Sequence, residues 1–175
     1  MKRILAVALV LGIFAGLTAC NSQKRLAHKR HVYMEKTYLE LKDSIKEAQV
    51  SILNDTIKVL FPENLLFPVG KAELLPVTKP LLIRFANALI KYNKTSILIN
   101  GYTDNTGGKD LNDQLSANRA KSTGDFLKAN QVKDSRIFTW GRGSRNPIAD
   151  NSTAAGRQKN RRVEFIILYD NNKRK

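Results

Sequence analysis

The segment from residue 97 to residue 120 most constrains how this chain of 175 residues folds. An apolar run, Ile-Leu-Ile at residues 97–99, leads into Gly-Tyr-Thr-Asp, and a turn cluster of Asn, Thr and two glycines follows. A helical pattern begins near Leu111, so the segment is predicted as strand, loop and helix. The short loop therefore sets the separation between side chains at the end of the strand and side chains on the helix.

An arginine on the apolar face of this predicted helix needs an explanation. At about 100° per residue, one face gathers apolar or small side chains: Leu111, Leu115, Thr123 and Phe126. Asn112 and Arg119 fall in the middle of that face. Because an unpaired buried charge is costly, Arg119 requires a partner, and Asp104 or a ligand carboxylate would serve. The spacing leaves three alternatives open: a structural Asp–Arg pair, an arginine that reaches out to water, or an arginine that binds a ligand carboxylate.

Composition restricts the class of protein more than it identifies it. The length allows one domain with appendages, and the hydrophobic content of 42% is ordinary for a globular chain. The formal net charge of +15 favours polyanionic surroundings such as nucleic acid, anionic lipid or an acidic polymer. The single cysteine excludes an internal disulfide. The two histidines, His28 and His31, precede the core pattern, so no metal site of Cys and His ligands is expected.

The first nineteen residues are predicted to be a signal peptide. Two basic residues precede an apolar stretch at residues 4–17, which is too short for an ordinary membrane span. The sequence Leu-Thr-Ala-Cys at residues 17–20 resembles the bacterial lipobox. That resemblance implies cleavage before Cys20 and acyl chains such as palmitate on Cys20, which would anchor the protein firmly. The alternative is a soluble secreted protein with an incidental cysteine.

Residues 20–48 are predicted to connect this lipid to the domain. Asn21 and Ser22 follow the cysteine, and in lipoproteins of the common enterobacterial type such residues imply sorting to the outer membrane, with the domain in the periplasm. Residues 21–31 are polar and basic, so we expect a tether that attracts anionic head groups. Residues 32–48 have helical periodicity, which fits a short stalk and a lead-in helix equally well.

The remaining periodicities predict one α+β domain over residues 49–169. The order is strand, helix, strand, helix, strand, strand, preceded by a β-hairpin around Asn54-Asp55. Such a βαβαββ chain forms a small mixed sheet with helices on one face, so a site belongs at loops on a sheet end or edge. The expected strands are 49–53, 56–61, 96–103, 136–141 and 162–168, the helices are 76–92 and 111–130, residues 141–157 form a long loop, and residues 170–175 form a basic tail.

Three blocks of residues resemble the OmpA-like peptidoglycan-binding domain, over about residues 50–168. This domain also occurs in peptidoglycan-associated lipoproteins and flagellar stator proteins. The blocks are Gly101-Tyr102-Thr103-Asp104 with Gly107; Leu111-Asn112 with Leu115-Ser116 and Arg119-Ala120; and Asn151 with Gly156-Arg157 and Asn160-Arg161-Arg162-Val163-Glu164. Two positions depart from the family pattern, because Tyr102 stands where histidine is common and Pro68 where aspartate is common.

The resemblance implies non-covalent binding of peptidoglycan at the meso-diaminopimelate of its stem peptide, which would anchor the outer membrane to the wall. It places ligand-binding residues at Asp104, Arg119, Asn112 and Arg161, and by weaker analogy at Thr103 and Gly70. The chemistry fits, because aspartate accepts from the ligand ammonium and an arginine fork holds its carboxylate. Asp104 is also expected to hold Arg119 in place when the site is empty.

Rival functions have less support in the sequence. A wall hydrolase would need paired carboxylates, and Asp110 and Asp113 lie at a helix start, where acidic residues complement the dipole. The predicted core has no histidine and no free thiol, so we expect neither an enzyme nor a cofactor. A hydrolase or assembly factor that uses the domain only for localisation stays an alternative, as does an envelope protein partner.

Nucleic-acid binding rests on charge alone and is not expected of an exported lipoprotein. Four arginines are expected to contribute to a basic surface or to a solvated loop: Arg142, Arg145, Arg157 and Arg162.

Overall fold

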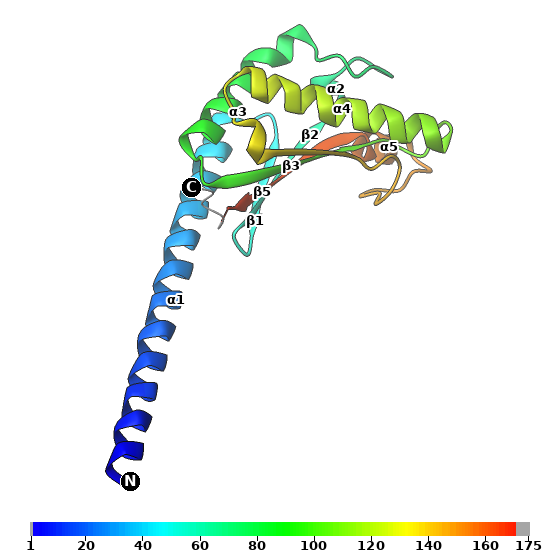
Figure 1. Cartoon of the computed structure of the whole chain (residues 1–175). Coiled ribbons are helices and arrows are strands. Elements are labelled where there is room, and N and C mark those ends of the chain that lie inside the picture. The colour runs from blue at the N-terminus through cyan, green and yellow to red at the C-terminus, as the bar shows by residue number, and fades with distance from the viewer. Residues whose placement is uncertain (1, 171–175) are drawn as a thin grey trace.

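A mixed sheet of five strands, ordered β1-β2-β5-β3-β4, organises the domain (Figure 1). The computed structural model describes the backbone of residues 2–170 and the side chains of residues 22–170. β3 and β4 run parallel, and every other neighbouring pair is antiparallel. The predicted mixed sheet is therefore confirmed, whereas the order of the strands within it was not predicted. The strands are β1 (Gln49–Leu53), β2 (Thr56–Pro62), β3 (Thr95–Tyr102), β4 (Ile137–Gly141) and β5 (Arg162–Tyr169).

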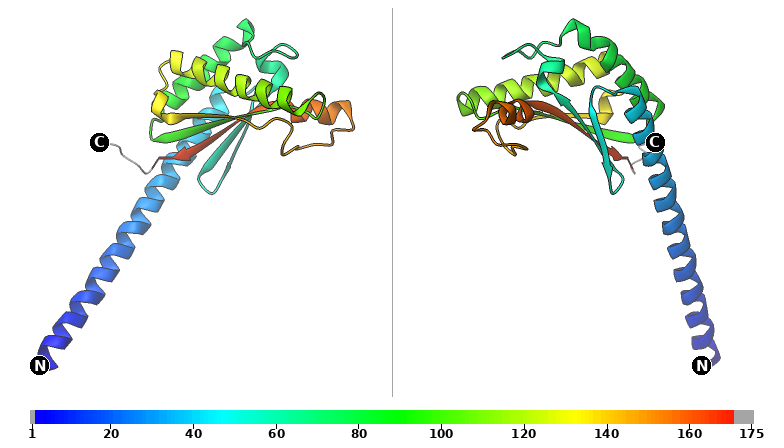
Figure 2. Two further views of the ribbon diagram at one scale, coloured as in Figure 1. Left: turned by 45° about the vertical axis from the view of Figure 1, so that its right-hand side comes forward. Right: turned by 180° about the vertical axis from the view of Figure 1, so that it is seen from behind.

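The helices α3 and α4 lie together on one face of this sheet (Figures 1 and 2). The α-helices are α1 (Lys2–Ser44), α2 (Glu63–Leu66), α3 (Lys79–Lys91), α4 (Lys109–Ala129) and α5 (Ala154–Asn160), and the 3-10 turns are η1 (Pro76–Thr78) and η2 (Asp134–Arg136). The helix α5 begins inside the stretch predicted as a loop, residues 141–157, and continues beyond it. Its two turns are too short for hydrophobic periodicity to reveal.

The turn between β1 and β2 has the backbone conformation that the hairpin prediction requires. Asn54 and Asp55 both have positive φ, 48° and 58°, which two-residue hairpin turns of type I′ need. Asn and Asp tolerate this left-handed conformation better than other residues with a side chain. The turn fixes the register, in which Leu53 lies opposite Thr56.

The hydrophobic core lies between the sheet and the helices. Phe61 on β2, Phe165 on β5 and Phe85 on α3 are fully buried, and their ring centroids lie 4.8–5.7 Å apart in tilted and edge-to-face contacts. Alternate residues of the three central strands point into this layer, as the period of two predicts. The strand residues that do so are Ile57, Val59, Phe61, Ile97, Ile99, Val163, Phe165 and Ile167.

The helix α4 buries Asn112, Arg119 and Thr123 of the predicted face, but small and polar residues fill this face where the pattern placed Leu111. Leu111 is 74% exposed, and the buried positions are Asn112, Ser116, Arg119, Ala120, Thr123, Gly124 and Leu127. The cause is a close approach to the sheet. A Cβ at Gly101 of β3 would lie 2.1 Å from the carbonyl oxygen of Ser116, and one at Gly141 of β4 would lie 2.6 Å from the amide nitrogen of Ala117. Leucines would not fit in this gap.

The helix α1 runs without interruption from Lys2 to Ser44 and includes residues 21–31, which were predicted as an irregular tether. That stretch has no Gly or Pro and is rich in helix formers, which explains the difference. The last turns pack on the domain and bury Met34, Leu41 and Ile45, while the rest of the helix projects away from it (Figures 1 and 2). Within the described residues, α1 and the other helices lack an apolar stretch long enough to span a bilayer.

Two predictions fall outside the residues that the structure describes in full. The side chain of Cys20, the predicted lipidation site, is one of them, and the basic tail at residues 171–175 is the other. Both stay predictions.

The hairpin turn also holds α1. Arg30 Nε donates to Asp55 Oδ2 at 3.1 Å, and His31 Nδ1 lies 2.7 Å from Asp55 Oδ1. The hydrogen bond with His31, and then that with Arg30, lower the pKa of the Asp55 carboxyl. Asp55 therefore defines both the turn and the point where the projecting part of α1 meets the domain.

Candidate functional site

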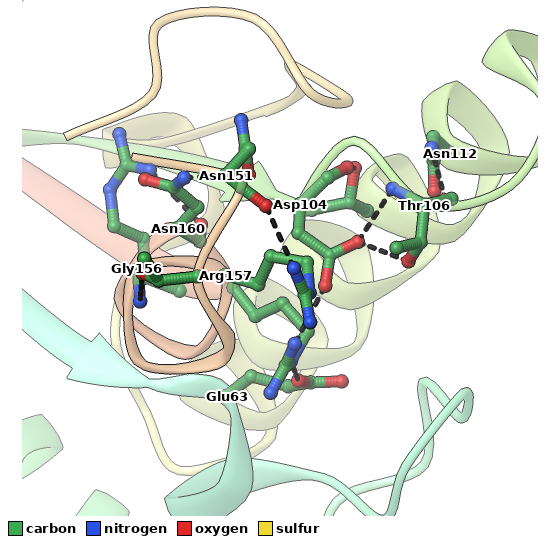
Figure 3. Close-up of polar contacts among 12 residues, drawn as sticks. Glu63, Asp104, Thr106, Asn112, Asn151, Gly156, Arg157 and Asn160 are labelled. Carbon is green, nitrogen blue, oxygen red and sulfur yellow. Dashed lines mark hydrogen bonds and ion pairs between the residues drawn. The ribbon is translucent and has the colours of Figure 1, made fainter. Parts of the chain in front are cut away.

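The candidate site lies where β3 ends and β5 begins (Figure 3). Antiparallel pairing of these strands places Tyr102 opposite Arg162. The residues just beyond this pair are thereby brought together: Thr103 and Asp104, which follow β3, and Arg161, which precedes β5. The expected position of the site at a sheet end follows from this register.

Asp104 is the buried acceptor at the centre of this site. Its Oδ2 accepts from Arg161 Nη1 at 2.6 Å, and its Oδ1 accepts from the backbone N–H of Thr106 at 2.9 Å and from the Thr106 hydroxyl. Burial by itself would raise the pKa of the Asp104 carboxyl, but the hydrogen bonds from Thr106 and Arg161 outweigh it and lower that pKa. Asp104 is therefore held as a carboxylate.

Arg161 joins Asp104 to a second carboxylate, Glu63, at the start of α2. Arg161 Nε donates to Glu63 Oε2 at 2.8 Å, and the Glu63 side chain is only 7% exposed. The Arg161 side chain is 35% exposed and is therefore more accessible than either carboxylate that it contacts. The hydrogen bonds and charges of Asp104 and Glu63 outweigh the effect of burial on the Arg161 guanidinium and raise its pKa.

Arg119 is paired with Glu63, and the expected contact between Arg119 and Asp104 is not formed. Its Nη2 donates to Glu63 Oε1, and its Nε donates to the carbonyl oxygen of Lys71 at 2.8 Å. The guanidinium also lies over the ring of Phe67, 5.5 Å from its centroid. The prediction that Arg119 needs a partner was right in kind, but the partner is a carboxylate that sequence reasoning missed.

These four side chains form an alternating chain of charges, which we call the ion network: Asp104, Arg161, Glu63 and Arg119. Its formal charges cancel. Both carboxylates and Arg119 are almost fully buried, so the network satisfies its own charges. The one partly exposed group, Arg161, bridges both carboxylates.

The other predicted site residues line the same end of the sheet. Asn112 Nδ2 donates to the Thr106 carbonyl oxygen at 2.9 Å and so supports the residue that binds Asp104. The Thr103 hydroxyl is buried and donates to the Asp104 carbonyl oxygen at 2.9 Å. Gly70 has φ of +69° and directly precedes Lys71, whose carbonyl holds Arg119. Three predicted positions, Asp104, Arg119 and Arg161, thus belong to the ion network, and the other three lie next to residues that contact it.

A buried asparagine positions Arg161. The Asn160 carboxamide accepts from the backbone N–H groups of Ile148 and Ala149, and donates to the Ala149 carbonyl oxygen and to Asn151 Oδ1 (Figure 3). These four contacts of 2.8–3.0 Å tie α5 to the preceding loop. Thr153 caps α5 by accepting from the Gly156 N–H at 3.0 Å.

Arg162 does not contribute to a basic surface, contrary to expectation. Its side chain is 2% exposed, donates to Glu164 Oε1 at 2.7 Å and lies over the Tyr102 ring at 3.8 Å from the centroid. Arg142 donates a hydrogen bond to Asn100, and Arg145 donates one to Asp113. The strands carry alternate residues to opposite faces, which separates Arg162 from Arg161.

Comparison with known proteins identifies the family. The OmpA family model matches residues 66–161, more than half of the chain. The chain belongs to the OmpA family. Its fold also matches the cell wall anchor of the T6SS from Pseudomonas aeruginosa, with a TM-score of 0.67 and 31% sequence identity over 76% of this chain and 95% of that one.

Three relatives show how far the similarity extends. The probable lipoprotein YiaD of Escherichia coli (strain K12) is 42% identical over 77% of this chain and 63% of YiaD. The peptidoglycan-binding protein ArfA of Mycobacterium tuberculosis (strain H37Rv) is 48% identical over 55% of this chain, which spans only 29% of ArfA. The outer-membrane lipoprotein YfiB of Pseudomonas aeruginosa (strain PAO1) is 32% identical over 95% of this chain and 94% of YfiB.

Proposed function

We propose that this chain is an outer-membrane lipoprotein that binds peptidoglycan non-covalently and tethers the membrane to the wall. The ion network, with Arg161 accessible between two buried carboxylates, is the observation that carries the proposal. The names of ArfA, as a peptidoglycan-binding protein, and of YfiB, as an outer-membrane lipoprotein, support it. The attachment to the membrane would be the lipid on Cys20.

The proposed ligand is the free end of meso-diaminopimelate, which carries one ammonium and one carboxylate on the same carbon. Arg161 Nη1 donates to Asp104 Oδ2, the atom that would accept from the ligand ammonium. We infer that the ammonium replaces Arg161 there, and that the released guanidinium then binds the ligand carboxylate. A neutral network would thus accept a zwitterion without leaving an unpaired charge, which keeps the cost of burial low.

The proposal includes no catalysed reaction. A wall hydrolase of the two-carboxylate type needs one carboxyl with a raised pKa as general acid. The pKa of the Asp104 carboxyl is lowered, and Glu63 is held between two arginines. This arrangement suits recognition of charge, and it does not suit proton transfer.

Co-sedimentation of the full chain, in detergent, with purified peptidoglycan tests the proposal. Asp104→Asn should weaken binding at least about tenfold, because a hydrogen bond to a charged group contributes about 1.5–3 kcal/mol. Asp110→Asn is the matched control, since Asp110 is exposed at the start of α4. Equal binding by Asp104→Asn and wild type would reject the site, and absence of wild-type binding would reject the function.

Competition separates recognition from charge-driven adsorption. Free meso-diaminopimelate should release the protein, whereas Nα-acetyl-lysine, which has an ammonium without a carboxylate beside it, should not. Equal release by both compounds would contradict a role for Arg161 in holding the carboxylate.

A further inference from the structure

The two edges of the sheet differ in how well they are protected from pairing with another chain. At one edge, α1 packs against β1, and Arg30 and His31 hold the adjoining turn at Asp55. At the other edge, β4 pairs only with β3 among the described strands, so one side of its backbone takes part in no ladder. Exposed edges of this kind readily pair with another chain.

The strand β4 also lacks the usual devices that block edge pairing. Its sequence, Ile-Phe-Thr-Trp-Gly, has no charged residue and no proline, and its three central residues are all exposed. Phe138 and Trp140 are 47% and 48% exposed, although large aromatic residues are ordinarily buried. Their rings stack with centroids 6.5 Å apart and planes 20° apart. This edge therefore presents both unpaired backbone groups and apolar side chains.

Phe138 and Trp140 lie on the face of the sheet opposite α4. Thr139 and Ile137 point toward the helix, because a Cβ at Gly124 would lie 2.9 Å and 3.4 Å from their methyl groups. Phe138 and Trp140 alternate with them and so point the other way. On that face, neighbouring strands add half-buried Leu98 and Ile166, so the aromatic pair continues an apolar strip across the sheet.

We propose that β4 pairs with β4 of a second copy of this chain, antiparallel and centred on Thr139. The strand is complementary to itself in this register. Phe138 of each copy lies opposite Trp140 of the other copy, and all four rings lie on the same face of the joined sheet. A twofold axis through Thr139 relates the two strands. The ladder spans the whole of β4 and joins the two sheets into one. Arg136, just beyond the strand, is turned inward to the carbonyl oxygens of Leu89 and Thr95 and does not face the partner.

The occupant is a second copy because, in a register centred on Thr139, the two exposed aromatic residues of the strand match each other: Phe138 of one copy faces Trp140 of the other. Copies held on one membrane would also meet at a raised effective concentration. The ion network involves no residue of β4, so the pairing uses none of its ion pairs. The proposal is therefore independent of the proposed function.

A cysteine at the twofold axis tests the register directly. In the full chain in detergent, Thr139→Cys should form an intermolecular disulfide on mild oxidation, since directly opposed residues of an antiparallel pair have Cα atoms about 4.5–5.5 Å apart. The parent chain, whose one cysteine is Cys20, and Lys121→Cys on the exposed surface of α4 are the controls. Cross-linking no greater than in the controls would overturn the proposal.

Mass measurement provides the second test. Light scattering of the wild-type chain, with the detergent contribution subtracted, should give the mass of a dimer, and Phe138→Lys with Trp140→Lys should halve it while thermal unfolding is unchanged. A wild-type monomer, or a dimer that survives both lysines, overturns the proposal. Wild-type monomers whose binding to lipid vesicles is lost on Trp140→Lys would assign the aromatic pair to a lipid surface instead.

Discussion

Glu63 accepts a hydrogen bond from Arg161, 98 residues further along the chain, at 2.8 Å. This contact links the start of α2 to the residue that follows α5, and it lies beside the backbone hydrogen bond from the Glu63 N–H to the Arg161 carbonyl oxygen at 3.0 Å. Glu63 also accepts from Arg119 on α4. One carboxylate therefore fixes the relative positions of three helices around the site.

Replacement of Glu63 should destabilise the protein more than an ordinary surface change. Glu63→Ala leaves Arg119 buried without a counter-ion, so we expect a loss of about 3–5 kcal/mol in the free energy of unfolding. Urea unfolding would measure it, with Glu73→Ala, at an exposed position, as the control. A loss below about 1 kcal/mol would show that Arg119 does not depend on Glu63.

The pKa of Asp104 predicts a contribution to stability that disappears in acid. Because the folded carboxyl binds its proton more weakly than the unfolded one, its contribution is complete above about pH 5 and is lost as the pH falls through the lowered pKa. The free energy of unfolding should therefore fall less between about pH 6 and about pH 3 in Asp104→Asn than in wild type. Parallel pH profiles of Asp104→Asn and wild type would contradict the lowered pKa of Asp104.

The close contact between α4 and the sheet predicts strong intolerance of a side chain at Gly101. In Gly101→Ala, the new methyl group would overlap the Ser116 carbonyl, which is backbone and cannot rotate away. We expect a loss of about 3 kcal/mol or more, measured by urea unfolding. Gly108→Ala meets no atom within 4 Å and should cost about 1 kcal/mol or less. Equal effects would show that α4 can shift outward freely.

Asn160 should affect wall binding without contacting the ligand. Asn160→Ala removes all four side-chain contacts that hold the loop before α5, so Arg161 should lose its position and binding to peptidoglycan should fall severalfold. Asn160→Asp keeps the acceptor for Ile148 and Ala149 and should retain more binding than Asn160→Ala. Co-sedimentation measures both, and equal losses would indicate that the accepted hydrogen bonds are not what positions Arg161.

Periodicity predicted the sheet and the hairpin because these depend on local alternation and on turn residues. The face of α4 was not predictable in the same way. Hydrophobicity alone favours burial of Leu111, whereas the observed packing follows from glycines on two strands that bring the helix backbone too close for leucine. How closely a helix packs depends on the residues of the surface that it contacts. The hydrophobic periodicity of the helix itself carries no information about those residues.

The ion network illustrates a second limit. The anomaly of Arg119 was visible in the helix, but its partner Glu63 lies 56 residues away, and no local spacing rule connects them. The only signal was a charged residue between two apolar stretches, directly after Pro62 at the end of a strand. The family resemblance supplied Asp104 and Arg161, which are correctly brought together, but it did not supply their shared carboxylate.

The continuity of α1 has a consequence for how the domain is presented. In a rigid helix, the distance of the domain from Cys20 and its rotation about the helix axis change together. Every residue between Cys20 and the contact at Arg30 adds about 1.5 Å of height and turns the domain by about 100°. Insertion of seven residues there would raise the domain by about 10 Å with nearly the same orientation, whereas five residues would turn it by roughly 140°. The length of this segment therefore sets the orientation of the domain as well as its distance from Cys20, the proposed lipidation site.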